Sequence, residues 1–242
     1  MESLKWLTSR PIAHRGLHDG NKNVWENTLA AFSRAMAGNY PIECDLHLTK
    51  DGVPVLFHDS DLKRLTGETG HVRERTAREM TALSIGGTDE KVVTLDQMLE
   101  HVGAKVPLVI ELKGDIGYDD GLVAAVAKRL SNYRGKAAIM SFDHHLIREF
   151  VRHAPEVPGG LTAEGLKDDD MEAHFSMLAH GISFVSYSVH HLPNRFISLV
   201  RHKLQMPVIT WTVRDALMLA YTYEHADQAT FELFNPEKTV FA

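Results

Sequence analysis

Residues 42–48 read Ile-Glu-Cys-Asp-Leu-His-Leu, a short run in which a polar side chain occupies every second position. Side chains of a β-strand point alternately to its two faces. One face of this run therefore carries Glu43, Asp45 and His47, and the other carries Cys44, Leu46 and Leu48. Carboxylates two positions apart lie roughly 6.6 Å apart along a strand, close enough to converge on one cation. The alternative is that both carboxylates face solvent at the end of the strand.

The rest of the chain repeats short apolar runs that alternate with amphipathic stretches, which is the pattern of β/α units. Eight is the number of strands that closes a (β/α)8 barrel, and the 242 residues fit the size of about 250 typical of that fold. We therefore predict an α/β protein, a (β/α)8 TIM barrel formed as a single domain by residues 1–242. The eight expected strands are residues 11–13, 42–47, 108–112, 137–141, 159–162, 183–187, 207–213 and 229–232.

Helices are expected between these strands, and three of them have a candidate N-cap. Asn27 precedes the stretch 28–36, Asp143 precedes the stretch that ends at His153, and Asp215 precedes the stretch that ends at His225. A fourth helix is expected within residues 119–130, where apolar residues recur at helical spacing.

One stretch departs from the alternation. Residues 53–57 read as an extra extended segment after the second strand, and residues 59–93 form a long polar connection. In a barrel, an insertion at the carboxyl end of a strand lies over the mouth of the active site. We therefore expect a small insertion, about residues 59–93, at that position.

Composition excludes several classes of protein. The net charge is −6 and the sequence pI is about 6.2, so the basic footprint of a nucleic-acid-binding protein is missing. Cys44 is the only cysteine, which rules out an intrachain disulfide and sites built from several cysteines. The sequence shows neither the apolar run of a secretory signal nor a membrane span. We expect a cytoplasmic protein.

A third carboxylate interrupts the apolar strand that follows the insertion. Residues 108–113 read Leu-Val-Ile-Glu-Leu-Lys, with Glu111 and Lys113 on one face. If this strand neighbours residues 42–48 in the barrel, Glu111 joins Glu43 and Asp45. Three carboxylates without sulfur suit Mg²⁺, Ca²⁺ or Mn²⁺ rather than a structural zinc. The alternative is a plain ion pair between Glu111 and Lys113.

Two histidines follow apolar runs directly. The first strand ends in Ala-His-Arg-Gly at residues 13–16, and His58 follows the segment 53–57. Paired histidines beside a metal site can divide the roles of acid and base, and Arg15 offers a planar fork for phosphate oxygens. The pairs at 144–145 and 190–191 are interpreted as helix-start or surface residues.

Two further residues are candidates for the expected mouth, Trp211 and Glu26. Trp211, near the end of the seventh strand, is either a buried aromatic or a wall against the substrate. Glu26 can reach the mouth, whereas a loop and a helix cap are enough to explain Asn27 and Thr28.

Taken together, the motifs resemble the glycerophosphodiester phosphodiesterase family of the bacterial cytoplasmic type. They occur in the order found in the family, over roughly residues 12–213. They are IAHRG (12–16), ENT (26–28), IECDLHLTKDGVPVLFHD (42–59), LKRLTGETG (62–70), TLDQMLE (94–100), IELK (110–113) and WTV (211–213).

The resemblance implies a metal-dependent enzyme that hydrolyses glycerophosphodiesters to glycerol 3-phosphate and an alcohol. It implies that Glu43, Asp45 and Glu111 bind one divalent cation and that His14 and His58 act as general acid and base. It also implies that Arg15 contacts phosphate, a role that we extend to Lys113 and Trp211 as substrate-binding residues, and that the insertion after His58 caps the mouth.

The chain departs from the family pattern in two places. Trp25 precedes Glu-Asn-Thr where the family usually has proline, and residues 226–232 read Ala-Asp-Gln-Ala-Thr-Phe-Glu where a glycine-rich strand with an aspartate is usual. The second departure falls on the expected eighth strand and leaves the catalytic set intact.

Other functions stay open at this point. A phospholipase-like or sphingomyelinase-like barrel can use similar residues, although no interfacial apolar segment is evident. A barrel glycosidase also needs two carboxylates but has no use for paired histidines with an adjacent arginine. A non-catalytic phosphoglycerol-binding barrel would not require both His14 and His58.

Overall fold

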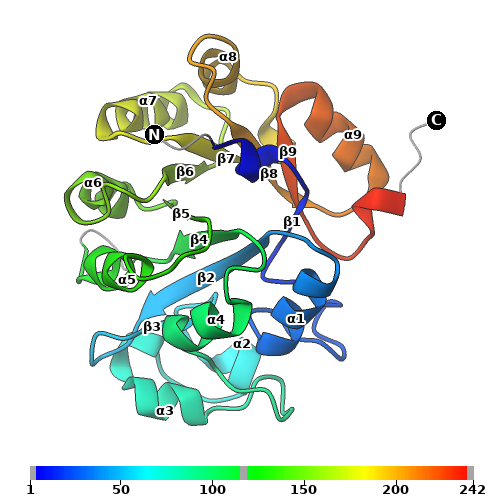
Figure 1. Cartoon of the computed structure of the whole chain (residues 1–242). Helices are drawn as coiled ribbons and strands as arrows, with labels where there is room; N and C mark the ends of the chain where they lie inside the picture. The colour runs from blue at the N-terminus through cyan, green and yellow to red at the C-terminus, as the bar shows by residue number, and fades with distance from the viewer. Residues whose placement is uncertain (1–3, 115–118, 239–242) are drawn as a thin grey trace.

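The structure is a computed structural model that describes residues 4–114 and 119–238. In this part of the chain eight parallel strands form a closed barrel, in the order β1-β9-β8-β7-β6-β5-β4-β2, with β2 pairing back to β1 (Figure 1). The strands are β1 (Ile12–Ala13), β2 (Ile42–Leu48), β4 (Leu108–Leu112), β5 (Ala137–Ser141), β6 (Gly159–Ala163), β7 (Phe184–Ser188), β8 (Val208–Val213) and β9 (Gln228–Phe231). The predicted (β/α)8 barrel is confirmed, and the eighth strand forms within the divergent stretch.

Helices surround the barrel (Figure 1). They are α1 (Leu29–Ala37), α4 (Leu95–Val102), α5 (Leu122–Leu130), α6 (His144–His153), α7 (Asp168–Met177), α8 (Arg195–His202) and α9 (Ala216–His225), with 3₁₀ turns η1 (Leu4–Thr8), η3 (Leu178–His180), η4 (Val189–His191) and η5 (Pro236–Lys238). Asp143 and Asp215 cap α6 and α9 as predicted. The N-cap of α1 is Thr28 rather than Asn27, because the Thr28 hydroxyl accepts the Ala31 N–H.

Two apolar layers hold the strands in place. The outer layer lies between barrel and helices and takes up Cys44 and Leu46 from β2. The inner layer fills the barrel toward the amino ends of its strands, where Val109 and Phe184 belong to one cluster with Trp6 of η1. Because Glu111 lies two residues beyond Val109, it points into the barrel above this inner layer.

The connection after β2 has its own small core, which differs from the polar loop expected for residues 59–93. It contains β3 (Pro54–Leu56), antiparallel to β2, then α2 (Lys63–Thr66), η2 (Val72–Glu74) and α3 (Ala77–Ala82). The core comprises Val55, Phe57, Leu62, Leu65, Val72, Met80, Ile85 and Val92. Val55 and Phe57 lie in the extended segment expected at 53–57, whereas the apolar residues of 59–93 are spread among polar ones, so the sequence predicts a polar connection there.

Trp25 packs against this core. Gly86, at φ 61°, makes room for it, since a Cβ on Gly86 would collide with the Trp25 ring. The tryptophan found in place of the usual proline therefore ties the loop before α1 to the insertion.

No helix among the described residues is long and apolar enough to cross a membrane.

Candidate active site

Three buried carboxylates meet inside the carboxyl end of the barrel. Glu43 and Asp45 point inward from β2, and Glu111 points inward from β4, where it is the register partner of Asp45. One carboxylate oxygen from each residue lies within 4.8 Å of the others. The parallel pairing of β2 with β4 thus brings together the three acids expected from the sequence.

Two cations and an amide surround Asp45. The Lys113 ammonium lies 3.1 Å from Oδ1 of Asp45 and also contacts Glu111, and Nε of Arg15 lies 3.4 Å from Oδ2 of Asp45. Asn27 donates from Nδ2 to Oδ2 of Asp45 at 2.9 Å and accepts the Asp45 backbone N–H at 3.2 Å. Each carboxylate oxygen of Asp45 therefore has a donor, Lys113 at Oδ1 and Asn27 at Oδ2, and Arg15 lies within ion-pair distance.

The three carboxyl groups respond differently to their shared burial. Burial raises the pKa of Glu43 well above its usual range, and the charges of Asp45 and Glu111 raise it further. Burial also raises the pKa of Glu111, although Lys113 opposes this. Burial acts in the same direction on Asp45, but Lys113 and Arg15 overcome it and hold its pKa below the usual range. The cluster contains three carboxyl groups, whereas only two cationic side chains in the described part of the chain, Lys113 and Arg15, lie beside it.

This cluster fits a divalent cation. Oε1 of Glu43 is buried without a hydrogen-bond partner among the described residues, although a buried carboxylate oxygen ordinarily has one. Hard cations bind oxygen ligands at about 2.0–2.6 Å, so oxygens within 4.8 Å of one another can share one ion. The donor set contains oxygen only.

His14 follows β1 and points toward these acids. Its Nδ1 lies 2.6 Å from Oε2 of Glu232, and its Nε2 lies 3.9 Å from Oε2 of Glu43. Burial lowers the pKa of His14, while the hydrogen bond to Glu232 opposes this. Sequence reasoning missed Glu232, which lies 218 positions from His14.

His58 lies just after β3 and is linked to Glu26 through the ion pairs that Asp59 and Arg64 form. Its Nδ1 lies 2.7 Å from Oδ1 of Asp59, and Arg64 binds Asp59 and Glu26 together. The hydrogen bond from Arg64 is the main reason why the pKa of Asp59 falls to about 2. Burial lowers the pKa of His58, and Asp45 opposes this. Glu26 reaches the site as expected and binds Nη1 of Arg15 at 2.7 Å.

Two residues at the site have left-handed backbones. Arg15 has φ 53° and Asn27 has φ 55°, which is unfavourable for an arginine and tolerated by an asparagine. This conformation accompanies a hydrogen bond of 2.9 Å from the Arg15 N–H to Oε2 of Glu43 and one of 3.0 Å from the Asn27 N–H to the Arg15 carbonyl. Such strain tends to occur at functional sites.

A cavity of about 180 Å³ contains all eight residues expected at the site. Trp211 lies on its wall, with its ring in edge contact with Phe142 at 5.2 Å between centroids. The indole Nε1 of Trp211 has no hydrogen-bond partner among the described residues. The lining comprises His14, Arg15, Glu43, Asp45, His58, Glu111, Lys113, Met140, Phe142, Ser186, Trp211, Thr212, Arg214 and Thr230.

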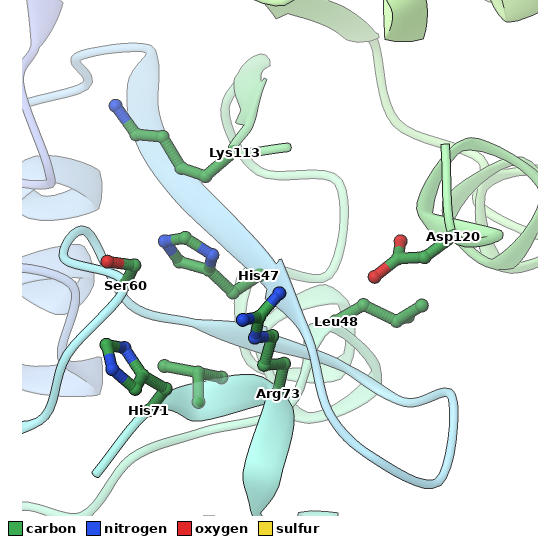
Figure 2. A pocket seen from close by; sticks show the side chains of 8 residues that line it. His47, Leu48, Ser60, His71, Arg73, Lys113 and Asp120 are labelled. Atoms are coloured by element: carbon green, nitrogen blue, oxygen red, sulfur yellow. The ribbon is translucent and has the colours of Figure 1, made fainter. Parts of the chain in front are cut away.

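A smaller cavity of about 110 Å³ adjoins the site and shares Lys113 with it (Figure 2). His47 and Arg73 point into it from below Lys113, and Asp120 faces them from the start of the α5 region (Figure 2). Its remaining lining residues are Leu48, Ser60, His71 and Val72.

The other histidine pairs lie outside the lining of the site cavity. His144 begins α6, and His190 is exposed in η4. Asn27, interpreted from sequence as a cap, belongs instead to the site through Asp45. Its position directly before a helix gave no sign of this contact.

The chain is similar to known proteins over nearly its whole length. The model of the glycerophosphoryl diester phosphodiesterase family matches residues 14–233. A glycerophosphodiester phosphodiesterase of Caldanaerobacter subterraneus is 38% identical over 162 residues, which are 62% of this chain and 65% of that protein. One of Bacillus altitudinis is 30% identical over 66% of this chain and 69% of its own length.

Solved structures show the same fold. A phosphodiesterase from Oleispira antarctica, in complex with the product sn-glycerol-3-phosphate, has a TM-score of 0.79 at 22% identity and covers 94% of both chains. A glycerophosphodiester phosphodiesterase from Parabacteroides distasonis has a TM-score of 0.79 at 24% identity, covering 95% of this chain and 94% of its own.

Fold and comparisons together define a TIM-barrel phosphodiesterase. The chain belongs to the glycerophosphoryl diester phosphodiesterase family, which confirms the family and the enzyme class expected from the sequence.

Proposed function

We propose that the protein hydrolyses glycerophosphodiesters to glycerol 3-phosphate and an alcohol by two-histidine acid–base catalysis that depends on a divalent metal. The observation that carries the proposal is the cavity in which His14 and His58 face the cluster of Glu43, Asp45 and Glu111. The relatives named as glycerophosphodiester phosphodiesterases support the substrate class.

In this proposal Glu43, Asp45 and Glu111 hold one divalent cation, Mg²⁺ or Ca²⁺, with Mn²⁺ as a further candidate. When bound, such a cation polarises a phosphoryl oxygen and lowers the pKa of a coordinated hydroxyl. The unpartnered, buried oxygen of Glu43 supports this assignment.

The two histidines move protons. One takes the proton of the glycerol 2-hydroxyl, whose oxygen then forms a bond to phosphorus, while the other donates a proton to the departing alcohol as its P–O bond breaks. The cyclic phosphate opens when water, deprotonated by one histidine, adds to phosphorus and the P–O bond to the 2-oxygen breaks. That oxygen takes a proton from the other histidine, so that the histidines exchange roles and glycerol 3-phosphate is left. Burial lowers the pKa of both imidazoles and so favours their neutral form, which suits whichever one acts first as base.

The remaining polar residues hold the substrate. Arg15 and Lys113 stabilise negative charge on the phosphoryl oxygens, since both line the cavity beside Asp45. Trp211 forms a wall together with Phe142. The edge-to-face contact keeps the indole in place against the substrate.

The test is release of glycerol 3-phosphate from a panel of glycerophosphodiesters, with and without exhaustive EDTA treatment. We expect activity that chelation abolishes and that Mg²⁺, Ca²⁺ or Mn²⁺ restores. Full activity after chelation would overturn the metal-dependent mechanism, and binding without any turnover would indicate a non-catalytic barrel.

A further inference from the structure

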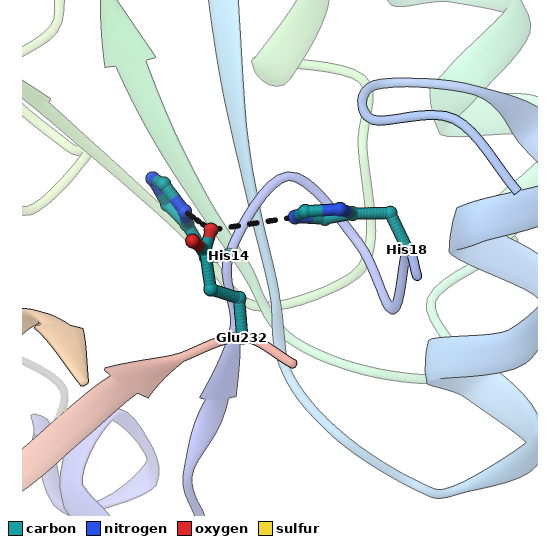
Figure 3. Close-up of side chains that lie close together, drawn as sticks. All are labelled: His14, His18 and Glu232. Atoms are coloured by element: carbon teal, nitrogen blue, oxygen red, sulfur yellow. Dashed lines mark hydrogen bonds and ion pairs between the residues drawn. The ribbon is translucent and has the colours of Figure 1, made fainter. Parts of the chain in front are cut away.

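Glu232 directly follows β9 and lies between two imidazole rings (Figure 3). Its Oε2 is 2.6 Å from Nδ1 of His14 and 3.4 Å from Nε2 of His18. The backbone N–H of Glu232 donates to the Val213 carbonyl at 3.0 Å, which anchors the residue where β8 ends. The carboxylate is therefore held in place by its strand and by its neighbours.

The second carboxylate oxygen also has a donor. Nε of Arg214 binds Oε1 of Glu232 at 2.7 Å. An ionised carboxylate only accepts hydrogen bonds, and arginine only donates them. Both oxygens of Glu232 are thus used as acceptors, Oε1 by Arg214 and Oε2 by Nδ1 of His14, while Nε2 of His18 lies within ion-pair distance of Oε2.

These contacts fix the tautomer of each imidazole. Because Oε2 of Glu232 accepts, the hydrogen of His14 lies on Nδ1, and its Nε2 presents a lone pair toward the side of Glu43. In His18 the backbone N–H of Gly20 donates to Nδ1 at 3.1 Å, so the hydrogen lies on Nε2 and faces Glu232.

The same tautomers argue against a second cation among these residues. His14, His18 and Glu232 are close enough to share an ion. A cation there would need lone pairs on Nδ1 of His14 and on Nε2 of His18, the nitrogens that carry hydrogens. The group is a hydrogen-bonded support for one histidine.

We propose that Glu232 is a positioning residue for His14: it holds the hydrogen of His14 on Nδ1 and keeps Nε2 free to exchange a proton with the substrate. This inference rests on the proposed acid–base role of His14. Arg214 and His18 keep the Glu232 carboxylate in the orientation that His14 needs.

The variant that tests this is Glu232→Gln. A glutamine has one acceptor oxygen, which the permanently charged Arg214 takes, so its NH₂ group turns toward His14 and donates to Nδ1. The hydrogen of His14 then moves to Nε2. Glu232→Asp keeps two acceptor oxygens and should keep more of the Nδ1–H tautomer.

The direct readout is a long-range ¹H–¹⁵N correlation spectrum of the Mg²⁺-loaded protein, recorded where the imidazoles are neutral. The His14 signals are assigned by their loss in His14→Gln. We expect an Nδ1–H tautomer in the wild type and Nε2–H in Glu232→Gln. An Nε2–H tautomer in the wild type, or no change in Glu232→Gln, would overturn the proposal.

Kinetics provide the second readout. For Glu232→Gln we expect kcat to fall about 10²–10⁴-fold with little change in KM, as for other histidines left in the wrong tautomer, and Glu232→Asp should recover part of the loss. The matched control is Asp227→Asn, since Asp227 also binds an arginine Nε, that of Arg201 at 2.9 Å. Unchanged kcat in Glu232→Gln with a switched tautomer would remove Glu232 from catalysis. Full activity of His14→Gln would instead remove the proposed function, whatever the tautomer.

Discussion

Asn27 and Asp45 exchange two hydrogen bonds across the barrel mouth, from Nδ2 of Asn27 to Oδ2 of Asp45 at 2.9 Å and from the Asp45 N–H back to Oδ1 of Asn27 at 3.2 Å. The loop before α1 is thereby joined to the central acid of the cluster. Asparagine suits this position for two reasons. It tolerates the left-handed backbone, and its side chain carries both a donor and an acceptor.

We expect Asn27→Ala to lower kcat/KM about 10–100-fold, because a hydrogen bond to a charged group contributes about 1.5–3 kcal/mol. Asn39→Ala is the control for backbone strain, since Asn39 has φ 53° and is exposed. Steady-state kinetics and thermal unfolding of both variants separate the two effects. Equal kcat/KM values for the two variants would contradict a role of Asn27 in the site.

The two histidines should differ sharply from the others in the chain. His14→Gln and His58→Gln should each lower kcat about 10²–10⁴-fold, the usual contribution of a general acid or base. His190→Gln, at an exposed position, should leave kcat unchanged. Circular dichroism checks that each variant is folded. A folded His14→Gln variant with wild-type kcat would overturn the assignment.

Glu43→Gln should remove cation binding while leaving the stability of the metal-free protein nearly unchanged. Burial and the neighbouring acids raise the pKa of Glu43 and so favour its neutral form when no cation is bound, and glutamine is a neutral counterpart of that acid. The Tm of the metal-free variant should therefore stay close to that of the wild type. For the wild type, cation at about 100 times its Kd should raise Tm by about 5–10 °C, and Glu43→Gln should lose this rise.

Exposed Glu68 provides the control, and Glu68→Gln should keep the whole increase in Tm. The measurement is thermal unfolding with and without Mg²⁺, Ca²⁺ and Mn²⁺. A full cation-induced increase in Glu43→Gln would show that the ion binds elsewhere.

His174 should make the fold sensitive to acid. It packs against Tyr187 and Phe196, and burial, assisted by His144, lowers its pKa to about 4. Between about pH 6.5 and about pH 4 the unfolded chain binds a proton that the folded protein does not. The free energy of unfolding therefore falls as the pH drops through this window.

Replacing His174 by phenylalanine keeps an aromatic ring and removes the proton site. His174→Phe should flatten the pH dependence by up to about 3 kcal/mol, measured by urea unfolding at about pH 7.5 and about pH 4.5. His190→Phe should retain the wild-type dependence. If the free energy of unfolding falls equally in His174→Phe and in the wild type between the two pH values, His174 is not the cause of the pH dependence.

The core of the site could be predicted because its determinants are local. The two-residue period of β2 sets Glu43 and Asp45 on one face, and pairing of neighbouring strands then brings Glu111 to Asp45. His14 and His58 directly follow apolar runs and thus lie at strand ends. Predicting these positions therefore requires no information about contacts between residues far apart in the sequence.

The residues that support this core could not be found in the same way. Asn27 lies 18 positions from Asp45, and its hydrogen bonds depend on how the loop before α1 folds back. Glu232 meets His14 only because β9 pairs with β1 when the barrel closes. The core of the insertion was missed for a related reason, since it forms only when Leu62, Leu65, Val72, Met80, Ile85 and Val92 pack against Val55 and Phe57.

The most direct test of the account uses a substrate that lacks the internal nucleophile. If the glycerol 2-hydroxyl attacks phosphorus, the first step is intramolecular and gains from high effective concentration. At saturating concentration, glycerophosphocholine should be hydrolysed to glycerol 3-phosphate, while its 2-deoxy analogue, with the same phosphate and leaving group, should be nearly inert. Turnover of the 2-deoxy analogue at a rate comparable to the parent would show that water attacks phosphorus directly, and it would contradict the two-histidine route through a cyclic phosphate.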